Sequence, residues 1–170
     1  MTDGLLLIHA FPLDARMWDP QLSAFAGAMP VSAPHLPGFG GSEPAPGGVM
    51  TMASAAERSR AELDRAGIDR AVVCGLSMGG YVALELWRTA PERFAGLVLA
   101  NMRAGADTQE GAAARRALAA RLRAEGSAFL VESPPPLLSD GAPGDLKAKV
   151  GDMIADQAPE AIAAASIGMA

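Results

Sequence analysis

Cysteine is nearly absent from this sequence, because Cys74 is the single thiol among 170 residues. One cysteine cannot form a disulfide within the chain, so the fold must be stable without one. Cys74 closes an apolar run, 71–74, and a thiol packed in the core is the favoured interpretation over a reactive one.

Clusters of positive charge are also missing. The net charge is -5 at pH 7, and the pair Arg115 and Arg116 lies in an alanine-rich helical pattern with acidic residues nearby. A protein that binds nucleic acid needs basic side chains to neutralise phosphates. We therefore expect no nucleic-acid partner.

The sequence has no basic leader and no long hydrophobic run at its start. The apolar run 5–8 is too short for a signal peptide or a membrane span. The expectation is a cytoplasmic protein without a membrane partner.

A glycine-rich loop is missing after the first apolar run. His9, Ala10, Phe11 and Pro12 follow it instead, and their backbone cannot hold a phosphate as glycine amides do. A nucleotide-binding module is therefore disfavoured.

What the sequence does contain is a regular alternation of apolar segments, with half of its residues hydrophobic. Continuous apolar runs predict strands at 5–8, 31–33, 71–74 and 96–100. Helical spacing predicts helices over 14–28, over 53–66 closed by Gly67, and over 78–89. This pattern is typical of an α/β fold with a mainly parallel, open sheet and flanking helices.

From about residue 108 onward, the sequence shows helical patterns broken by proline and glycine and no further strand. Active groups of such folds collect at the carboxyl ends of the strands. His9, His35, Ser77 and Asn101 fall at these ends.

The stretch from Gly75 to Gly80, Gly-Leu-Ser-Met-Gly-Gly, is the most informative motif. It follows an apolar run and precedes an amphipathic one, so it predicts a strand, a sharp turn and a helix. The turn exposes the Ser77 hydroxyl above the end of the sheet, and the glycines leave room for a crowded backbone.

Four motifs in order give the chain a strong resemblance to the α/β-hydrolase superfamily, and most closely to its small esterase, enol-lactonase and peroxidase-like members with a helical cap. The motifs are 9–12 (HAFP), 33–42 (APHLPGFGGS), 75–80 (GLSMGG) and 97–101 (LVLAN). The resemblance implies a partial α/β-hydrolase fold in which 1–102 form the core and 103–170 form a helical cap-like region.

This resemblance implies a serine hydrolase that acts on small carboxylic esters or lactones, with Ser77 as the nucleophile of an acyl-enzyme mechanism. The backbone N–H of Met78, at a helix start, is one expected oxyanion donor. The N–H of Phe11 is the second by resemblance. We expect Trp18, Phe39 and the cap to surround an apolar substrate, with no cofactor and no metal.

The catalytic base is the main departure from the family. Family members carry their histidine, and usually their acid, on strands that follow the cap, but no histidine follows Ser77 here. His35 stands where the family usually has aspartate, and it either serves as the base or shapes the proline-glycine loop. His9 is favoured as a structural residue under the oxyanion loop.

Two acids are open to alternative interpretations. Asp107 is either the third member of a triad or, with Thr108, a cap for the next helix, and the cap is favoured. Asp14 is interpreted as another helix-start residue.

Residues 161–170 resemble the middle of the family's last cap helix, so we expect an interrupted chain that lacks the C-terminal part of the fold. The strand at 97–100 would then be an exposed apolar edge, which predicts self-association. The alternative function is a truncated, inactive or weakly active core that binds small apolar ligands or needs a complementary chain.

Overall fold

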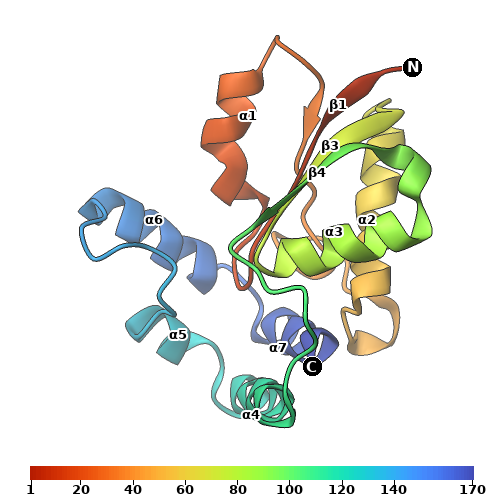
Figure 1. Cartoon of the computed structure of the whole chain (residues 1–170). Helices are drawn as coiled ribbons and strands as arrows, with labels where there is room; N and C mark the ends of the chain where they lie inside the picture. The colour runs from red at the N-terminus through yellow and green to blue at the C-terminus, as the bar shows by residue number, and fades with distance from the viewer.

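The computed structural model describes residues 1–170 and contains one sheet of four parallel strands. The strands are β1 (Asp3–Ile8), β2 (Val31–Ser32), β3 (Arg70–Leu76) and β4 (Phe94–Ala100). Their order across the sheet is β2-β1-β3-β4 (Figure 1). The predicted parallel open sheet is confirmed.

Strands β1 and β3 begin earlier than the apolar runs predict, because charged side chains pair across their first residues. Asp3 of β1 lies opposite Arg70 of β3 in the register of the sheet. The Arg70 guanidinium donates to the Asp3 carboxylate, with 3.0 Å between Nη2 and Oδ2. An apolar pattern cannot reveal strand ends that are stabilised by an ion pair.

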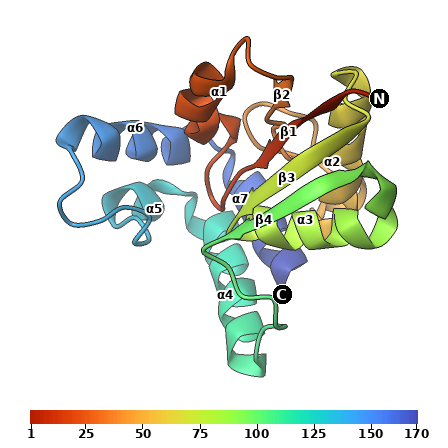
Figure 2. The same ribbon diagram turned by 45° about the horizontal axis from the view of Figure 1, so that its top comes forward.

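Helices lie on both faces of the sheet (Figures 1 and 2). They are α1 (Asp19–Phe25), α2 (Met52–Arg65) and α3 (Met78–Thr89), with short 3-10 turns η1 (Ala15–Trp18), η2 (Pro46–Gly48) and η3 (Pro91–Arg93). On one face is α1, and α2 and α3 pack together on the other.

The predicted helix over 14–28 is divided into η1 and α1 in the structure. No side chain of α1 is buried, and Phe25 is 39% exposed. Trp18 of η1 is buried instead. The apolar spacing of this segment therefore does not give α1 a buried face.

The prediction that Gly67 closes α2 is confirmed. Gly67 directly follows the C-cap residue, Ala66. Gly67 has a φ of +67°, and its N–H donates to the Asp64 carbonyl at 3.2 Å. The Ile68 N–H donates to the Leu63 carbonyl at 2.9 Å, which completes a Schellman motif.

The C-terminal region is helical, as predicted. It contains α4 (Gln109–Glu125), α5 (Ala128–Glu132), α6 (Gly144–Ala155) and α7 (Pro159–Met169). Thr108 caps α4, because its Oγ1 accepts a hydrogen bond from the Gly111 N–H at 3.1 Å. No helix in the protein is both long and apolar enough to cross a membrane.

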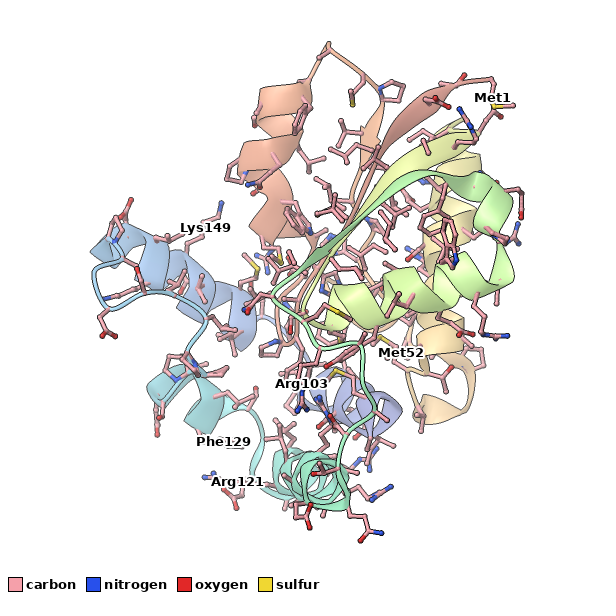
Figure 3. The ribbon with its side chains drawn as sticks, viewed as in Figure 1. Met1, Met52, Arg103, Arg121, Phe129 and Lys149 are labelled. Carbon is pink, nitrogen blue, oxygen red and sulfur yellow. The ribbon has the colours of Figure 1, made fainter.

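This helical region packs directly on the sheet domain. Helices α4 and α7 lie side by side, and Ile162 of α7 belongs to the same hydrophobic cluster as Leu6 and Val73 of the strands. Lys149 of α6 lies near α1 (Figure 3), where its Nζ is 3.4 Å from the Asp19 carboxylate. The two regions thus share a continuous core.

One edge of the sheet is apolar and uncovered. Three consecutive side chains of β4 are exposed, at 37% for Leu97, 45% for Val98 and 39% for Leu99. Strand β4 pairs with β3 on its other side only.

Candidate active site

Ser77 lies at the turn between β3 and α3 and has an unusual backbone conformation. Its φ is 52° and its ψ is -114°. A positive φ is strained for a residue with a Cβ atom and needs support from its surroundings. The Ser77 N–H donates to the Ala100 carbonyl of β4 at 2.9 Å, which fixes the turn to the neighbouring strand.

The glycines on either side of Ser77 are required by close backbone contacts. A Cβ at Gly75 would lie 2.2 Å from the Gly79 carbonyl oxygen. A Cβ at Gly79 would lie 2.2 Å from the Ile8 carbonyl oxygen and 2.9 Å from that of His9. The first turn of α3 is therefore packed against the end of β1, which brings the segment after His9 next to the elbow.

The N–H groups of Phe11 and Met78 are available for a ligand. Neither is a donor in the hydrogen bonds of the turns, loops and caps. Met78 is the first residue of α3, where the helix dipole favours negative charge. The Ser77 hydroxyl, on a half-buried residue, makes no hydrogen bond within the chain.

His9 is fully buried and uses both of its ring nitrogens. Nδ1 donates to the Ala10 carbonyl at 3.1 Å, and Nε2 accepts from the Leu36 N–H at 3.1 Å. Burial lowers its pKa from 6.5 to about 4. A neutral ring without a free lone pair cannot take a proton from Ser77, which agrees with the structural role expected for His9.

His35 is half-buried and lies over the proline-glycine loop. Its Nδ1 accepts from the Ala15 N–H at 3.3 Å, and a Cβ at Gly40 would lie 2.0 Å from that nitrogen. The ring borders an open polar groove of about 430 Å³ together with Arg16 and Asp156. No hydrogen bond joins His35 to Ser77, although Nε2 has no partner in the chain.

Asp107 forms ion pairs rather than a contact with a histidine. It accepts from the Arg115 Nε, and an Arg103 nitrogen lies 3.5 Å away. The hydrogen bond from Arg115 holds the pKa of Asp107 below its usual value. Thr108, and not Asp107, is the residue that caps α4.

Asp14 is a helix-start residue, as expected, and is also part of a buried network. It caps η1 by accepting from the Arg16 N–H at 2.9 Å. Burial opposes its ionisation, but hydrogen bonds from Arg16 and Gln157 outweigh that effect and lower the pKa of Asp14.

An apolar pocket of about 200 Å³ opens between the core and α6. On the core side it is lined by Ala10 and Leu76, the residues directly before Phe11 and Ser77. Across from them lie Leu138, Leu146, Val150 and Met153.

The expected lining by Trp18 and Phe39 is wrong for this pocket. Phe39 is completely buried and packs edge-on to the His9 ring, with 5.3 Å between centroids. The lining residues of α6, Leu146, Val150 and Met153, have the spacing of one helix face, and this spacing was the available signal in the sequence.

No group of three or more His, Cys, Asp or Glu side chains is placed to hold a metal ion.

Comparison with known proteins agrees with this geometry. The family model for the alpha/beta hydrolase fold matches residues 4–125. A thermophilic esterase from Thermogutta terrifontis has a similar structure, with a TM-score of 0.91 and 38% identity over 98% of this chain and 62% of that one.

Two relatives by sequence are also similar. A pimeloyl-[acyl-carrier protein] methyl ester esterase of Aromatoleum aromaticum is 39% identical over 95 residues, which are 56% of this chain and 35% of that protein. The 3-oxoadipate enol-lactonase 1 of Acinetobacter baylyi is 34% identical over 130 residues, 76% of this chain and 47% of the relative.

The chain thus spans less than half the length of these two relatives and 62% of the similar esterase structure. The family match nevertheless covers most of the chain and includes both the sheet and the elbow at Ser77. This chain belongs to the alpha/beta hydrolase fold family.

Proposed function

We propose that the protein is a serine hydrolase that cleaves small carboxylic esters or lactones through an acyl-enzyme at Ser77. The observation that carries the proposal is the strained turn that presents Ser77 at the start of α3, beside the unpartnered backbone N–H of Met78. Esterase and enol-lactonase relatives support the same reaction class.

In this mechanism the Ser77 Oγ attacks the ester carbonyl carbon while a base takes the hydroxyl proton. The carbonyl oxygen becomes an oxyanion, held by the N–H groups of Met78 and Phe11. The tetrahedral intermediate expels the alcohol, which receives the proton. Water then attacks the acyl-enzyme, and the carboxylic acid leaves as Ser77 regains its proton.

His35 is the candidate base within the chain, through its Nε2. While Nδ1 accepts from the Ala15 N–H, the neutral ring carries its proton on Nε2, so His35 can act as a base only after this hydrogen bond breaks and the ring proton moves to Nδ1. His35 would need to approach Ser77 when substrate binds, since the resting geometry has no bond between them. A histidine supplied by another chain is the alternative source of the base.

The apolar pocket beside Ala10 and Leu76 is the proposed site of the substrate's hydrocarbon part. Its small volume favours short acyl or lactone groups.

The test is hydrolysis of p-nitrophenyl acetate and butyrate by the wild type, Ser77→Ala and His35→Ala. We expect weak turnover by the wild type and none by Ser77→Ala. In the wild type, mass spectrometry after treatment with a fluorophosphonate probe should show the probe covalently bound to Ser77. Turnover that persists in Ser77→Ala would remove Ser77 from the mechanism. Full activity in His35→Ala would assign the base to another source.

The second candidate is a weakly active or inactive core that binds small apolar ligands or needs a complementary chain. The absence of a Ser77–His35 hydrogen bond favours it. Butyrate or butanol binding measured by NMR, without turnover of any activated ester, would support this candidate over the first.

We also propose self-association through the exposed β4 edge at 97–100. A row of unpaired backbone groups flanked by exposed Leu97, Val98 and Leu99 is a template for strand pairing. Val98→Lys should convert an associated species to a monomer in sedimentation velocity. A wild type that is monomeric at micromolar concentration would contradict the proposal.

The cytoplasmic location and the division into 1–102 and 103–170 are further proposals. Cell fractionation tests the first of these. Limited proteolysis tests the second, with cleavage expected near the exposed residues 103–106.

A further inference from the structure

A buried polar network joins three segments that are distant in the sequence. Its centre is Gln157, which is 2% exposed and lies in the turn between α6 and α7. Its Nε2 donates to the Asp14 carboxylate at 2.8 Å and to the Met153 carbonyl at 2.7 Å. Its Oε1 accepts from the Gly40 N–H at 2.9 Å.

All the polar atoms of this amide have partners, so the network specifies one position of the helical region on the core. Asp14 is completely buried, and its remaining partners come from Arg16, whose Nη2 lies 2.7 Å from Oδ2. Arg16 also donates to Asp156 at 2.8 Å, next to Gln157 in the chain. The Gln157 side chain thus connects η1, the proline-glycine loop and the α6–α7 turn.

The network reaches the candidate oxyanion donor through a short, tightly bonded segment. Phe11 lies in a turn closed by the hydrogen bond from the Leu13 N–H to the Ala10 carbonyl, at 2.9 Å. The Ala10 N–H in turn lies 3.2 Å from the Met17 sulfur of η1. Asp14, one residue after this turn, caps η1.

We propose that Gln157 is a positioning residue for the proposed hydrolysis, because it holds Asp14 and η1 in the place that aims the Phe11 N–H at the substrate oxygen. The proposal rests on the proposed function for its catalytic consequence. Its structural part, the control of the Phe11 turn by the α6–α7 turn, stands independently.

An oxyanion donor stabilises the transition state more than the bound substrate, and small displacements of such groups reduce rates strongly. Loss of the Gln157 bonds should therefore lower kcat while KM changes little. A contact that merely holds the fold together would instead lower the amount of folded enzyme and leave kcat per folded molecule unchanged.

The first variant is Gln157→Leu, which keeps the approximate size of the side chain and removes its polar atoms. The control is Ser166→Ala in α7, where the buried hydroxyl donates to the Arg115 carbonyl at 2.9 Å, within the helical region itself. Amide hydrogen exchange of residues 10–17 is the readout that does not need activity.

We expect at least tenfold faster exchange in residues 10–17 of Gln157→Leu than in Ser166→Ala. For p-nitrophenyl butyrate we expect kcat lower by about 10-fold to 100-fold, with KM within about threefold. Unchanged exchange in the Phe11 turn would overturn the proposal whatever the activity. Altered exchange in a protein whose wild type hydrolyses no ester would contradict only the proposed function.

A second variant, Gln157→Glu, tests the proposal by a different readout in case Gln157→Leu does not fold. It places a second carboxylate against Asp14, among the nearby groups Arg16, Asp156, His9 and His35. Two carboxylates at this distance favour sharing one proton, which restores a hydrogen bond at lower pH. We expect kcat of this variant, as a ratio to wild type, to rise at least threefold between pH 8 and pH 5.5, and a constant ratio would overturn the proposal.

Discussion

The Nε2 atom of His9 accepts a hydrogen bond from the backbone N–H of Leu36, with 3.1 Å between the nitrogens. His9 follows β1 directly and Leu36 belongs to the proline-glycine loop, so one neutral ring connects the segment that carries the proposed oxyanion donor Phe11 with that loop. The opposite ring nitrogen donates to Ala10. Protonation of Nε2 would abolish the acceptor and leave a buried charge.

We predict that this ring makes stability depend on pH between 6.5 and 4. The pKa of His9 is about 4 in the folded protein and 6.5 in the unfolded chain, so the unfolded state binds more protons in this range. The contribution is complete above pH 6.5 and disappears as the pH falls through 4, on the order of 3 kcal/mol in total.

Urea unfolding of wild type and His9→Gln at pH 7, 6, 5 and 4 measures this contribution. The wild-type advantage in the free energy of unfolding should shrink by about 3 kcal/mol across the series. An advantage that stays constant with pH would mean that His9 titrates alike in both states.

We predict that Ser77→Gly stabilises the protein while it removes the proposed nucleophile. Glycine adopts positive φ freely, so the strain at φ 52° is released. Ser77→Ala keeps the strain and serves as the control. Thermal unfolding should give Ser77→Gly a free energy of unfolding about 1 kcal/mol above that of Ser77→Ala; equal stability would mean that the turn stores no strain.

Much of the fold was predictable because its signals are local. The run 71–74, the glycines around Ser77 and the helix over 78–89 each point to one backbone conformation, and the structure has β3, the elbow and α3 there. The motif order predicts the family in the same way, since the residues that build an elbow must be adjacent in the chain.

The parts that failed depend on contacts between distant residues. The pocket lining by Leu138 and Leu146, in place of Trp18 and Phe39, follows from where α6 packs on the core. The Asp14–Gln157 hydrogen bond spans 143 positions, and nothing in either local sequence indicates it. The availability of His35 depends likewise on the Ala15 N–H, which occupies its Nδ1.

We predict opposite effects for two glycine-to-alanine substitutions. A Cβ at Gly79 would clash with the Ile8 carbonyl oxygen, so Gly79→Ala should cost about 3 kcal/mol or more. Gly151 lies within α6, and a Cβ there meets no atom within 4 Å.

Gly151→Ala should therefore stabilise the protein by about 1 kcal/mol and raise Tm by roughly 2–4 °C. Differential scanning calorimetry of both variants measures the two effects. Tolerance of alanine at position 79 would show that the first turn of α3 does not lie against β1 as described.

We predict that Leu146→Trp narrows the range of ester chain lengths that the proposed enzyme accepts. Leu146 lines the apolar pocket and is 40% exposed, so a larger side chain can be accommodated without disturbing the core. The indole would fill pocket volume that a longer acyl chain needs, whereas acetate needs little of it. The ratio of kcat/KM for p-nitrophenyl hexanoate to that for the acetate should fall about tenfold, since the indole would displace about two of the additional methylenes from the pocket and each buried methylene contributes about 0.8 kcal/mol. Val131→Trp is the matched control, because Val131 is 37% exposed on α5 and does not line that pocket. An equal fall in both variants would place the acyl chain outside this pocket.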